Sequence, residues 1–165
     1  MPMPENSCFF TGHRYAPNDA KLIAKTNDVI VDLIENKGIT EFYAGGAVGW
    51  DMICENIILD LKEKYLQIKL HLVLPCQPEI QTSKWNNEQK EEYHKILKFA
   101  DDVEFVSKKY SKDCMKKRNT RLVEQGGICV CYFNENDSRS GTAQTVRMAR
   151  ESGKEIINMH DFYGK

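Results

Sequence analysis

The stretch EFYAGGAVGWD (residues 41–51) joins the two patterns that decide the fold. Its first four residues are strand-like, and from Asp51 onward the apolar residues recur at helical spacing. Gly45, Gly46 and Gly49 lie between the two patterns. Dense glycine costs conformational entropy, so this turn needs unusual backbone geometry or a close approach to another group. Taken alone, the loop is equally compatible with a tight turn and with a phosphate cradle.

The same order of strand and helix repeats along the chain. Apolar runs predict strands, and helical spacing predicts helices, with Gly38 and Gly153 as C-terminal caps. The predicted strands cover residues 7–11, 41–44, 69–74, 102–106, 128–133 and 155–159, and the predicted helices cover 22–34, 51–61, 86–99, 115–125 and 142–152. This alternation, with right-handed crossovers, predicts a Rossmann-like, doubly wound α/β fold: a mostly parallel sheet flanked by helices on both faces. We expect one domain spanning residues 1–165.

Bulk composition restricts the class of protein. The chain is 41% hydrophobic and 28% charged, which is ordinary for a globular domain, and its formal net charge of −1 argues against a broad nucleic-acid-binding field. No run approaches the roughly 18 apolar residues that cross a bilayer. Residues 1–6 lack the basic flank and apolar core of a signal peptide. These features predict a cytoplasmic protein without a membrane partner.

The six cysteines and four histidines do not form a metal-binding pattern. Cys8, Cys129 and Cys131 lie in apolar runs and Cys54 lies in a helical pattern, where thiols pack as small hydrophobic groups. There is no C-x-x-C pair, and no histidine lies at zinc-ligand spacing from a cysteine. We therefore expect reduced, structural thiols and no metal.

Glycine, hydroxyl and basic residues follow the predicted strands at their carboxyl ends, where folds of this type bind ligands. Backbone N–H groups at a helix start hold phosphate or carboxylate well, and Arg14 and Arg118 would add bidentate contacts. The sequence therefore predicts a site for an anionic ligand. The candidate binding residues are Thr11, Gly12, His13, Arg14, Gly45, Gly46, Gly49, Trp50, Asp51, Arg118, Asn119, Ser140, Gly141 and Thr142.

Several of these residues also have a purely structural interpretation. Asp51 would accept hydrogen bonds from a ribose or a base, or would only stabilise the first turn of its helix. Trp50 or Tyr110 would stack on a base, or would only pack. His13 would act as a base or would only bind backbone, and Ser140 begins a segment that is also an ordinary helix cap.

No standard nucleotide or hydrolase motif is present. The turn after the first strand lacks G-x-G-x-x-G, and AGGAVG follows the second strand with a different internal spacing. The chain also lacks G-x-x-x-x-G-K-[ST] and G-x-S-x-G. These absences argue against ATP hydrolysis by a P-loop and against a serine hydrolase triad.

Five motifs, in order along nearly the whole chain, resemble the SLOG superfamily, which is named after the Smf/DprA DNA-processing proteins and the cytokinin-activating Lonely-guy proteins. They are CFFTGHR (8–14), YAGGAVGWD (43–51), LPC (74–76), KKRN (116–119) and SGTAQTVRMA (140–149). The sequence is most similar to the small, single-domain YpsA-like branch. The resemblance implies a Rossmann-like fold that binds a nucleotide or a nucleotide-derived molecule such as ADP-ribose or an NAD-like ligand.

The family motifs fall on particular positions of this chain. The resemblance places the first-strand motif on Thr11–Arg14, the glycine loop on Gly45–Asp51 and the second phosphate loop on Ser140–Thr142. Arg118 and Asn119 match a basic element typical of the branch.

The resemblance does not supply a catalytic group. Lonely-guy enzymes, which release ribose 5-phosphate from nucleotides, carry P-G-G-x-G-T-x-x-E, and Thr145 stands here in place of the glutamate. Asp51, or Glu55 one helical turn later, is then the candidate catalytic carboxylate. The DNA-processing proteins have longer chains and additional domains.

Three functions follow, in order of preference. The first is a sensor or regulatory domain that binds a small-molecule nucleotide ligand, with no cofactor assigned beyond that ligand and with a homo-oligomer as the default assembly. The second is a hydrolase acting on an N-glycosidic bond of a nucleotide. The third, least favoured, is a single-stranded nucleic-acid module that uses Lys108, Lys109, Lys112, Lys116, Lys117 and Arg121.

Overall fold

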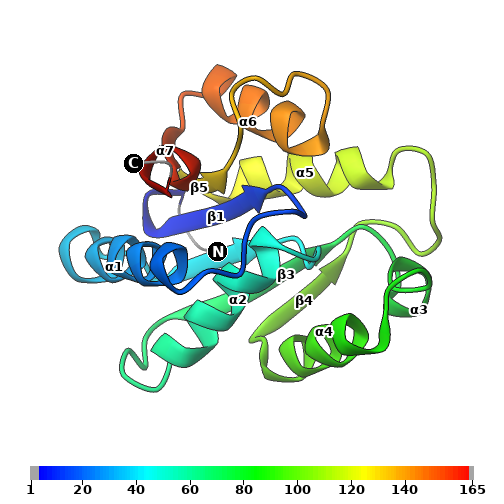
Figure 1. Ribbon diagram of the computed structural model, residues 1–165, viewed down its shortest axis with the longest axis horizontal. Coiled ribbons are helices and arrows are strands. Elements are labelled where there is room, and N and C mark those ends of the chain that lie inside the picture. The colour runs from blue at the N-terminus through cyan, green and yellow to red at the C-terminus, as the bar shows by residue number, and fades with distance from the viewer. Residues whose placement is uncertain (1–3, 164–165) are drawn as a thin grey trace.

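A six-stranded parallel sheet lies between two layers of helices in the computed structural model, which describes residues 4–163 (Figure 1). The strands are β1 (Ser7–Gly12), β2 (Glu41–Ala44), β3 (Lys69–Leu74), β4 (Asp102–Phe105), β5 (Ile128–Tyr132) and β6 (Glu155–Asn158). The helices are α1 (Ala20–Lys37), α2 (Trp50–Leu61), α3 (Pro78–Gln81), α4 (Asn87–Phe99), α5 (Cys114–Gln125), α6 (Gly141–Glu151) and α7 (Met159–Tyr163), and a 3-10 turn covers Pro4–Asn6. The strand order is β4-β3-β2-β1-β5-β6, with every neighbouring pair parallel. The predicted Rossmann-like α/β fold is confirmed. Residues 1–3, at the start of the segment compared with a signal peptide, lie outside the described residues.

The two faces of the sheet carry separate hydrophobic clusters. Successive side chains of a strand point to opposite faces, so Phe10 joins the cluster under α1, α2 and α4, whereas Phe9 joins the cluster under α5 and α6. Cys129 and Cys131 lie together in the second cluster, as their spacing predicts. Both faces of the central strands are therefore buried, which explains their unbroken apolar sequences.

Local signals set the ends of the long helices. The Asp19 side chain accepts a hydrogen bond from the N–H of Lys21 at the start of α1, and Gly38 ends that helix in the left-handed conformation. A reciprocal capping box between Asn86 and Gln89 starts α4. Ser140 caps α6 through a hydrogen bond from the N–H of Ala143.

Two short helices depart from the prediction. Pro78 begins α3 between a predicted strand and a predicted helix, where no helix was predicted, because its fixed φ suits the first position of a helix. The last strand ends at Asn158 rather than at residue 159, and α7 follows it directly. The Asn158 side chain explains this end, because its Oδ1 accepts a hydrogen bond from the N–H of His160 in α7.

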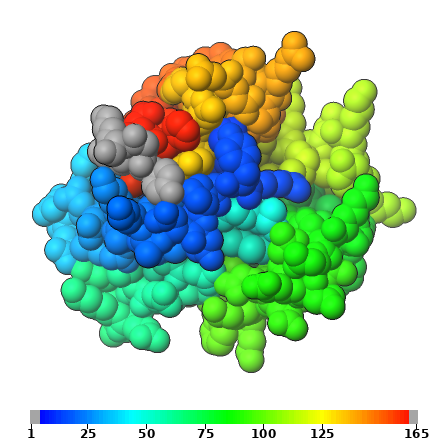
Figure 2. Space-filling model, viewed as in Figure 1, coloured from blue at the N-terminus to red at the C-terminus, as the bar shows by residue number. Residues whose placement is uncertain are grey.

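The order of connections reverses between the adjacent strands β1 and β5. The chain leaves β1 toward α1 on one face of the sheet and leaves β5 toward α6 on the other face (Figure 1). In the space-filling view, the blue segment that follows β1 reaches the surface next to the yellow and orange region of β5 and α6 (Figure 2). This divergence opens a crevice at the carboxyl ends of the strands, where doubly wound folds bind ligands.

Candidate functional site

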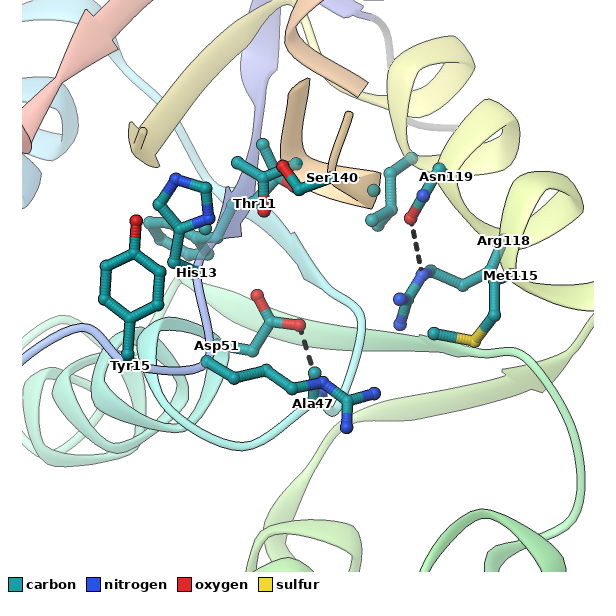
Figure 3. Close-up of a pocket in the computed structure, with 15 residues that line it drawn as sticks. Thr11, His13, Tyr15, Ala47, Asp51, Met115, Arg118, Asn119 and Ser140 are labelled. Carbon is teal, nitrogen blue, oxygen red and sulfur yellow. Dashed lines mark hydrogen bonds between the residues drawn. The ribbon is translucent and has the colours of Figure 1, made fainter. Parts of the chain in front are cut away.

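A cavity of about 370 Å³ occupies the crevice between β1 and β5 (Figure 3). This volume lies within the roughly 300–1,000 Å³ typical of small-molecule sites. Thr11–Arg14, Asp51, Arg118, Asn119 and Ser140–Thr142, all selected from the sequence, line the cavity. The other residues of its wall are Phe10, Tyr15, Ala47, Met115 and Leu122. Tyr15 was not among the residues selected from the sequence, although it directly follows the TGHR motif.

The three glycines of the loop lie behind this wall, whereas Ala47 between them is part of it. Gly45, Gly46 and Gly49 do not line the cavity. The N–H of Gly46 donates to Glu55 Oε2 at 3.0 Å, and the N–H of Ala47 donates to Asp51 Oδ2 at 3.1 Å. The protein's own carboxylates therefore occupy two of the loop's N–H groups, and the expected contact between these glycines and a ligand stays a prediction.

The glycines instead permit close packing behind the site. A Cβ atom at position 45 would lie 2.3 Å from Nη1 of Arg118. Gly49 has a φ of +81°, and a Cβ atom there would lie 2.3 Å from the carbonyl oxygen of Arg14. The loop thus brings Arg118 and the segment after β1 close to its backbone.

Trp50, one of the candidate ligand contacts, is a core residue and does not line the cavity. Its side chain is fully buried, its ring lies where a Cβ atom of Gly12 would be, and its Nε1 donates to the carbonyl of Val130 at 3.3 Å. Tyr110, the other aromatic residue considered, is exposed but does not line the cavity. Neither residue is placed to stack on a ligand in this cavity.

Arg118 is a buried cation in the cavity wall. One turn into α5, it donates through Nη1 to the carbonyl of Gly45 at 2.5 Å and through Nε to Oδ1 of Asn119 at 2.8 Å. Burial lowers the pKa of its guanidinium, and the Asp51 carboxylate opposes that change. No described residue binds Nη2, so this donor is available to a ligand.

Asp51 and Glu55 form a buried carboxyl pair on α2. Burial raises the pKa of Asp51 to about 6, with Arg118 as the largest opposing influence. Burial and the neighbouring Asp51 raise the pKa of Glu55 well above its usual range. Asp51 lines the cavity, and its Oδ1 accepts no hydrogen bond from a described residue. Glu55 does not line the cavity, so Asp51 alone of the two catalytic candidates can touch a bound molecule there.

His13 connects the ends of β1 and β5. The backbone N–H of His13 donates to the carbonyl of Tyr132 at 3.2 Å, and its ring Nε2 accepts a hydrogen bond from the backbone N–H of Asn134 at 3.1 Å. Nε2 therefore carries no proton, and burial lowers the pKa of the ring. This geometry favours the structural interpretation of His13 over a role as a base.

The start of α6 supplies backbone donors to the same cavity. The Ser140 N–H donates to Oδ1 of Asp137, and the Ala143 N–H donates to the Ser140 hydroxyl. Among residues 4–163, the N–H groups of Gly141 and Thr142 have no hydrogen-bond partner. Thr145, which replaces the Lonely-guy glutamate, is fully buried and donates to the carbonyl of Gly141 at 2.8 Å, so it faces the helix and not the cavity.

Comparison with known proteins identifies the family. The family model described as the YspA SLOG family matches residues 15–162. The chain belongs to the YspA SLOG family. A UPF0398 protein of Halalkalibacterium halodurans is 29% identical over 141 residues, covering 80% of this chain and 72% of the relative. A UPF0398 protein of Bacillus pumilus is 31% identical over 108 residues, covering 64% of this chain and 56% of the relative.

Two solved structures share the fold of this YspA SLOG family member. DNA processing protein A from Helicobacter pylori, studied for its single-stranded DNA binding mode, superposes with a TM-score of 0.64 at 16% identity, over 93% of this chain and 64% of that one. The structural-genomics target TM1055 superposes with a TM-score of 0.52 at 14% identity, over 92% of this chain and 72% of that one.

No helix within residues 4–163 combines the length and apolar character needed to cross a membrane. The same part of the chain contains no group of three or more His, Cys, Asp or Glu side chains arranged to hold a metal ion. All six cysteines are free and buried, including the four predicted to be so.

Proposed function

We propose that this chain is a binding or sensor domain for a phosphate-bearing, nucleotide-derived small molecule, held in the cavity between β1 and β5. The ligand's anionic end lies against Arg118 and the first turn of α6, and its ribose hydroxyls lie near Asp51. The proposal also retains a cytoplasmic location, a single domain and a homo-oligomeric assembly.

One observation carries the proposal: a buried arginine and a helix start with two unused N–H groups line the same cavity. A guanidinium forms strong charge-assisted bonds to phosphate, and a helix N-terminus favours negative charge. Arg14, exposed at the rim, adds a second positive charge. Membership of the YspA SLOG family supports a nucleotide-type ligand.

Gly141→Asp tests this placement without disturbing the core. A Cβ atom at position 141 would meet only Nδ2 of Asn119, at 3.7 Å, which is an ordinary contact. A carboxylate in the first turn of a helix stabilises it by roughly 0.3–1 kcal/mol, so the variant should unfold no more easily than the wild type. The same carboxylate would lie where the ligand's phosphate is proposed to bind.

The measurement is a thermal-shift titration with ADP, ADP-ribose and NAD. At a ligand concentration of about 100 times Kd, the wild type should gain about 2.7 kcal/mol of stability. Gly141→Asp should lose this gain, whereas Gly141→Asn, which has nearly the same volume without the charge, should keep most of it. Equal ligand-induced stabilisation of the wild type and Gly141→Asp would refute the site.

A second candidate function is hydrolysis of an N-glycosidic bond in a nucleotide. The observation that favours it is the pKa of Asp51, raised by burial to about 6, in the cavity wall. This pKa suits general acid–base catalysis near neutral pH. The test is release of free base from AMP or ADP, which Asp51→Asn should abolish and Glu55→Gln should leave in place. Ligand stabilisation without base release favours the sensor.

Single-stranded nucleic acid is the third candidate. DNA processing protein A from Helicobacter pylori binds single-stranded DNA, and this chain shares its fold. The lysines from Lys108 to Lys117 are exposed but do not line the cavity, and Arg121 pairs with Glu104. Salt-dependent binding to single strands, lost when these lysines are neutralised, would favour this candidate over a small-molecule ligand.

A further inference from the structure

An aromatic column leads from the core to the mouth of the cavity. The ring of His13 packs at a tilt on Phe133, with centroids 5.9 Å apart. The ring of Tyr15 stacks on His13 at 4.6 Å with an interplanar angle of 11°. Phe133 and His13 are buried, whereas the Tyr15 residue is 65% exposed. The column therefore ends in an aromatic ring that solvent can reach.

Backbone contacts hold the inner end of this column, at His13, in place. The carbonyl of His13 accepts hydrogen bonds from the N–H of Ala16 at 3.2 Å and from the N–H of Trp50 at 3.3 Å. The bond from Asn134 to Nε2 fixes the orientation of the imidazole. Because Gly49 has no Cβ atom, the carbonyl of Arg14 can lie against its backbone. Tyr15 thus extends from a segment that is anchored on both sides.

The column faces the anionic end of the site across the cavity. In Figure 3, His13 and Tyr15 lie on one side, Arg118 and Asn119 lie on the opposite side, and Asp51 lies between them. A nucleotide offers three chemically different parts in the same order: a flat base, a sugar with hydroxyl groups, and phosphate. Packing within the fold does not account for the exposed part of the Tyr15 ring.

We propose that Tyr15 is the base-stacking residue of this site. The proposal rests on the proposed function and narrows its ligand to molecules with an aromatic base, held at the Tyr15 end with the phosphate toward Arg118. Ring stacking tolerates any base, because every base presents a flat π-face. Sugar phosphates without a base would bind only through the opposite end.

AMP and ribose 5-phosphate test the proposal, because they share the sugar and the phosphate and differ by the base. Their Kd values would be measured by isothermal titration calorimetry on the wild type, Tyr15→Ala and Tyr15→Phe. Tyr110→Ala is the matched control, since Tyr110 is 67% exposed and lies outside the cavity. Because Tyr15 is at the surface, none of these changes is expected to unfold the chain.

Tyr15→Ala should weaken AMP binding roughly 5- to 150-fold, the range for loss of one base stack. The same variant should leave the affinity for ribose 5-phosphate unchanged, and Tyr15→Phe and Tyr110→Ala should leave both affinities unchanged. Unaltered AMP affinity in Tyr15→Ala, or an equal loss for both ligands, would overturn the stacking role while leaving the proposed function intact. If the wild type bound neither AMP nor ribose 5-phosphate, the proposed function would fail and the stacking role with it.

Discussion

Replacing Asp51 with asparagine should stabilise the folded chain at neutral pH. Burial raises the pKa of this carboxyl from 3.8 to about 6, although Arg118 and the N–H of Ala47 favour its charged form. A carboxyl with a higher pKa in the folded state favours folding most below its unfolded pKa, and that contribution is lost as the pH rises through the folded pKa. The interval between 3.8 and about 6 corresponds to about 3 kcal/mol of unfolding free energy.

Asparagine nearly preserves the volume of the side chain, and its Oδ1 still accepts the hydrogen bond from Ala47, but it does not titrate. The unfolding free energy of Asp51→Asn, relative to the wild type, should therefore rise by about 2.4 kcal/mol between pH 4 and pH 8, and the rest of the change lies below pH 4. Urea denaturation at a series of pH values measures this difference, provided that the m-values of the two proteins agree.

Asp137→Asn supplies a control of opposite sign. Hydrogen bonds from Ser140 and Arg139 lower the pKa of Asp137, so its contribution to stability is present above its unfolded pKa and is lost as the pH falls. The relative stability of Asp137→Asn should therefore fall, not rise, as the pH increases toward about 4, and should stay nearly constant at higher pH. A difference between Asp51→Asn and the wild type that stays constant from pH 4 to pH 8 would refute the assignment of Asp51 as a buried, destabilising charge.

Two other substitutions and one labelling reaction give further predictions from the same structure. Gly49→Ala should destabilise the fold by roughly 1–3 kcal/mol more than Gly38→Ala, because both residues have positive φ but only Gly49 lies against a carbonyl oxygen; equal losses in urea denaturation would contradict this. Asn158→Leu should cost about 1–3 kcal/mol for each backbone group of Phe133 that it leaves unpaired, and an unchanged melting temperature would show that those bonds do not matter. The native protein should react slowly with Ellman's reagent, because all six thiols are buried, and should release six thiols on denaturation; rapid labelling of the native protein would contradict this burial.

The sequence predicted the fold well because its strongest signals come from burial. The unbroken apolar run Ile128–Phe133 indicated a buried strand, and β5 covers Ile128–Tyr132 of it; Gly38 ends α1 in the left-handed conformation that its position implied. Strand order could not be obtained in this way, because periodicity does not say which strands are neighbours. Short helices such as α3 gave too few residues for a periodic pattern.

Part of the lining of the cavity could be predicted from the sequence. Thr11–Arg14, Arg118 and Ser140–Thr142 meet at one cavity because all follow or face the carboxyl ends of β1 and β5. Sequence spacing does not show that Asp51 and Glu55 turn back to accept N–H groups of the glycine loop, so it did not predict that the three glycines lie outside the cavity lining. Tyr15 was missed because a single aromatic residue in a polar loop carries no periodic signal.

The central claim is that a ligand's phosphate binds at the start of α6 and not at the glycine loop. The most direct measurement is a ¹H–¹⁵N correlation spectrum recorded during titration with ADP. The amide signals of Gly141 and Thr142, which have no partner among the described residues, should show the largest shifts, whereas that of Gly46, already bound to Glu55 and outside the cavity lining, should barely move. A large shift at Gly46, with Gly141 and Thr142 unchanged, would contradict the claim.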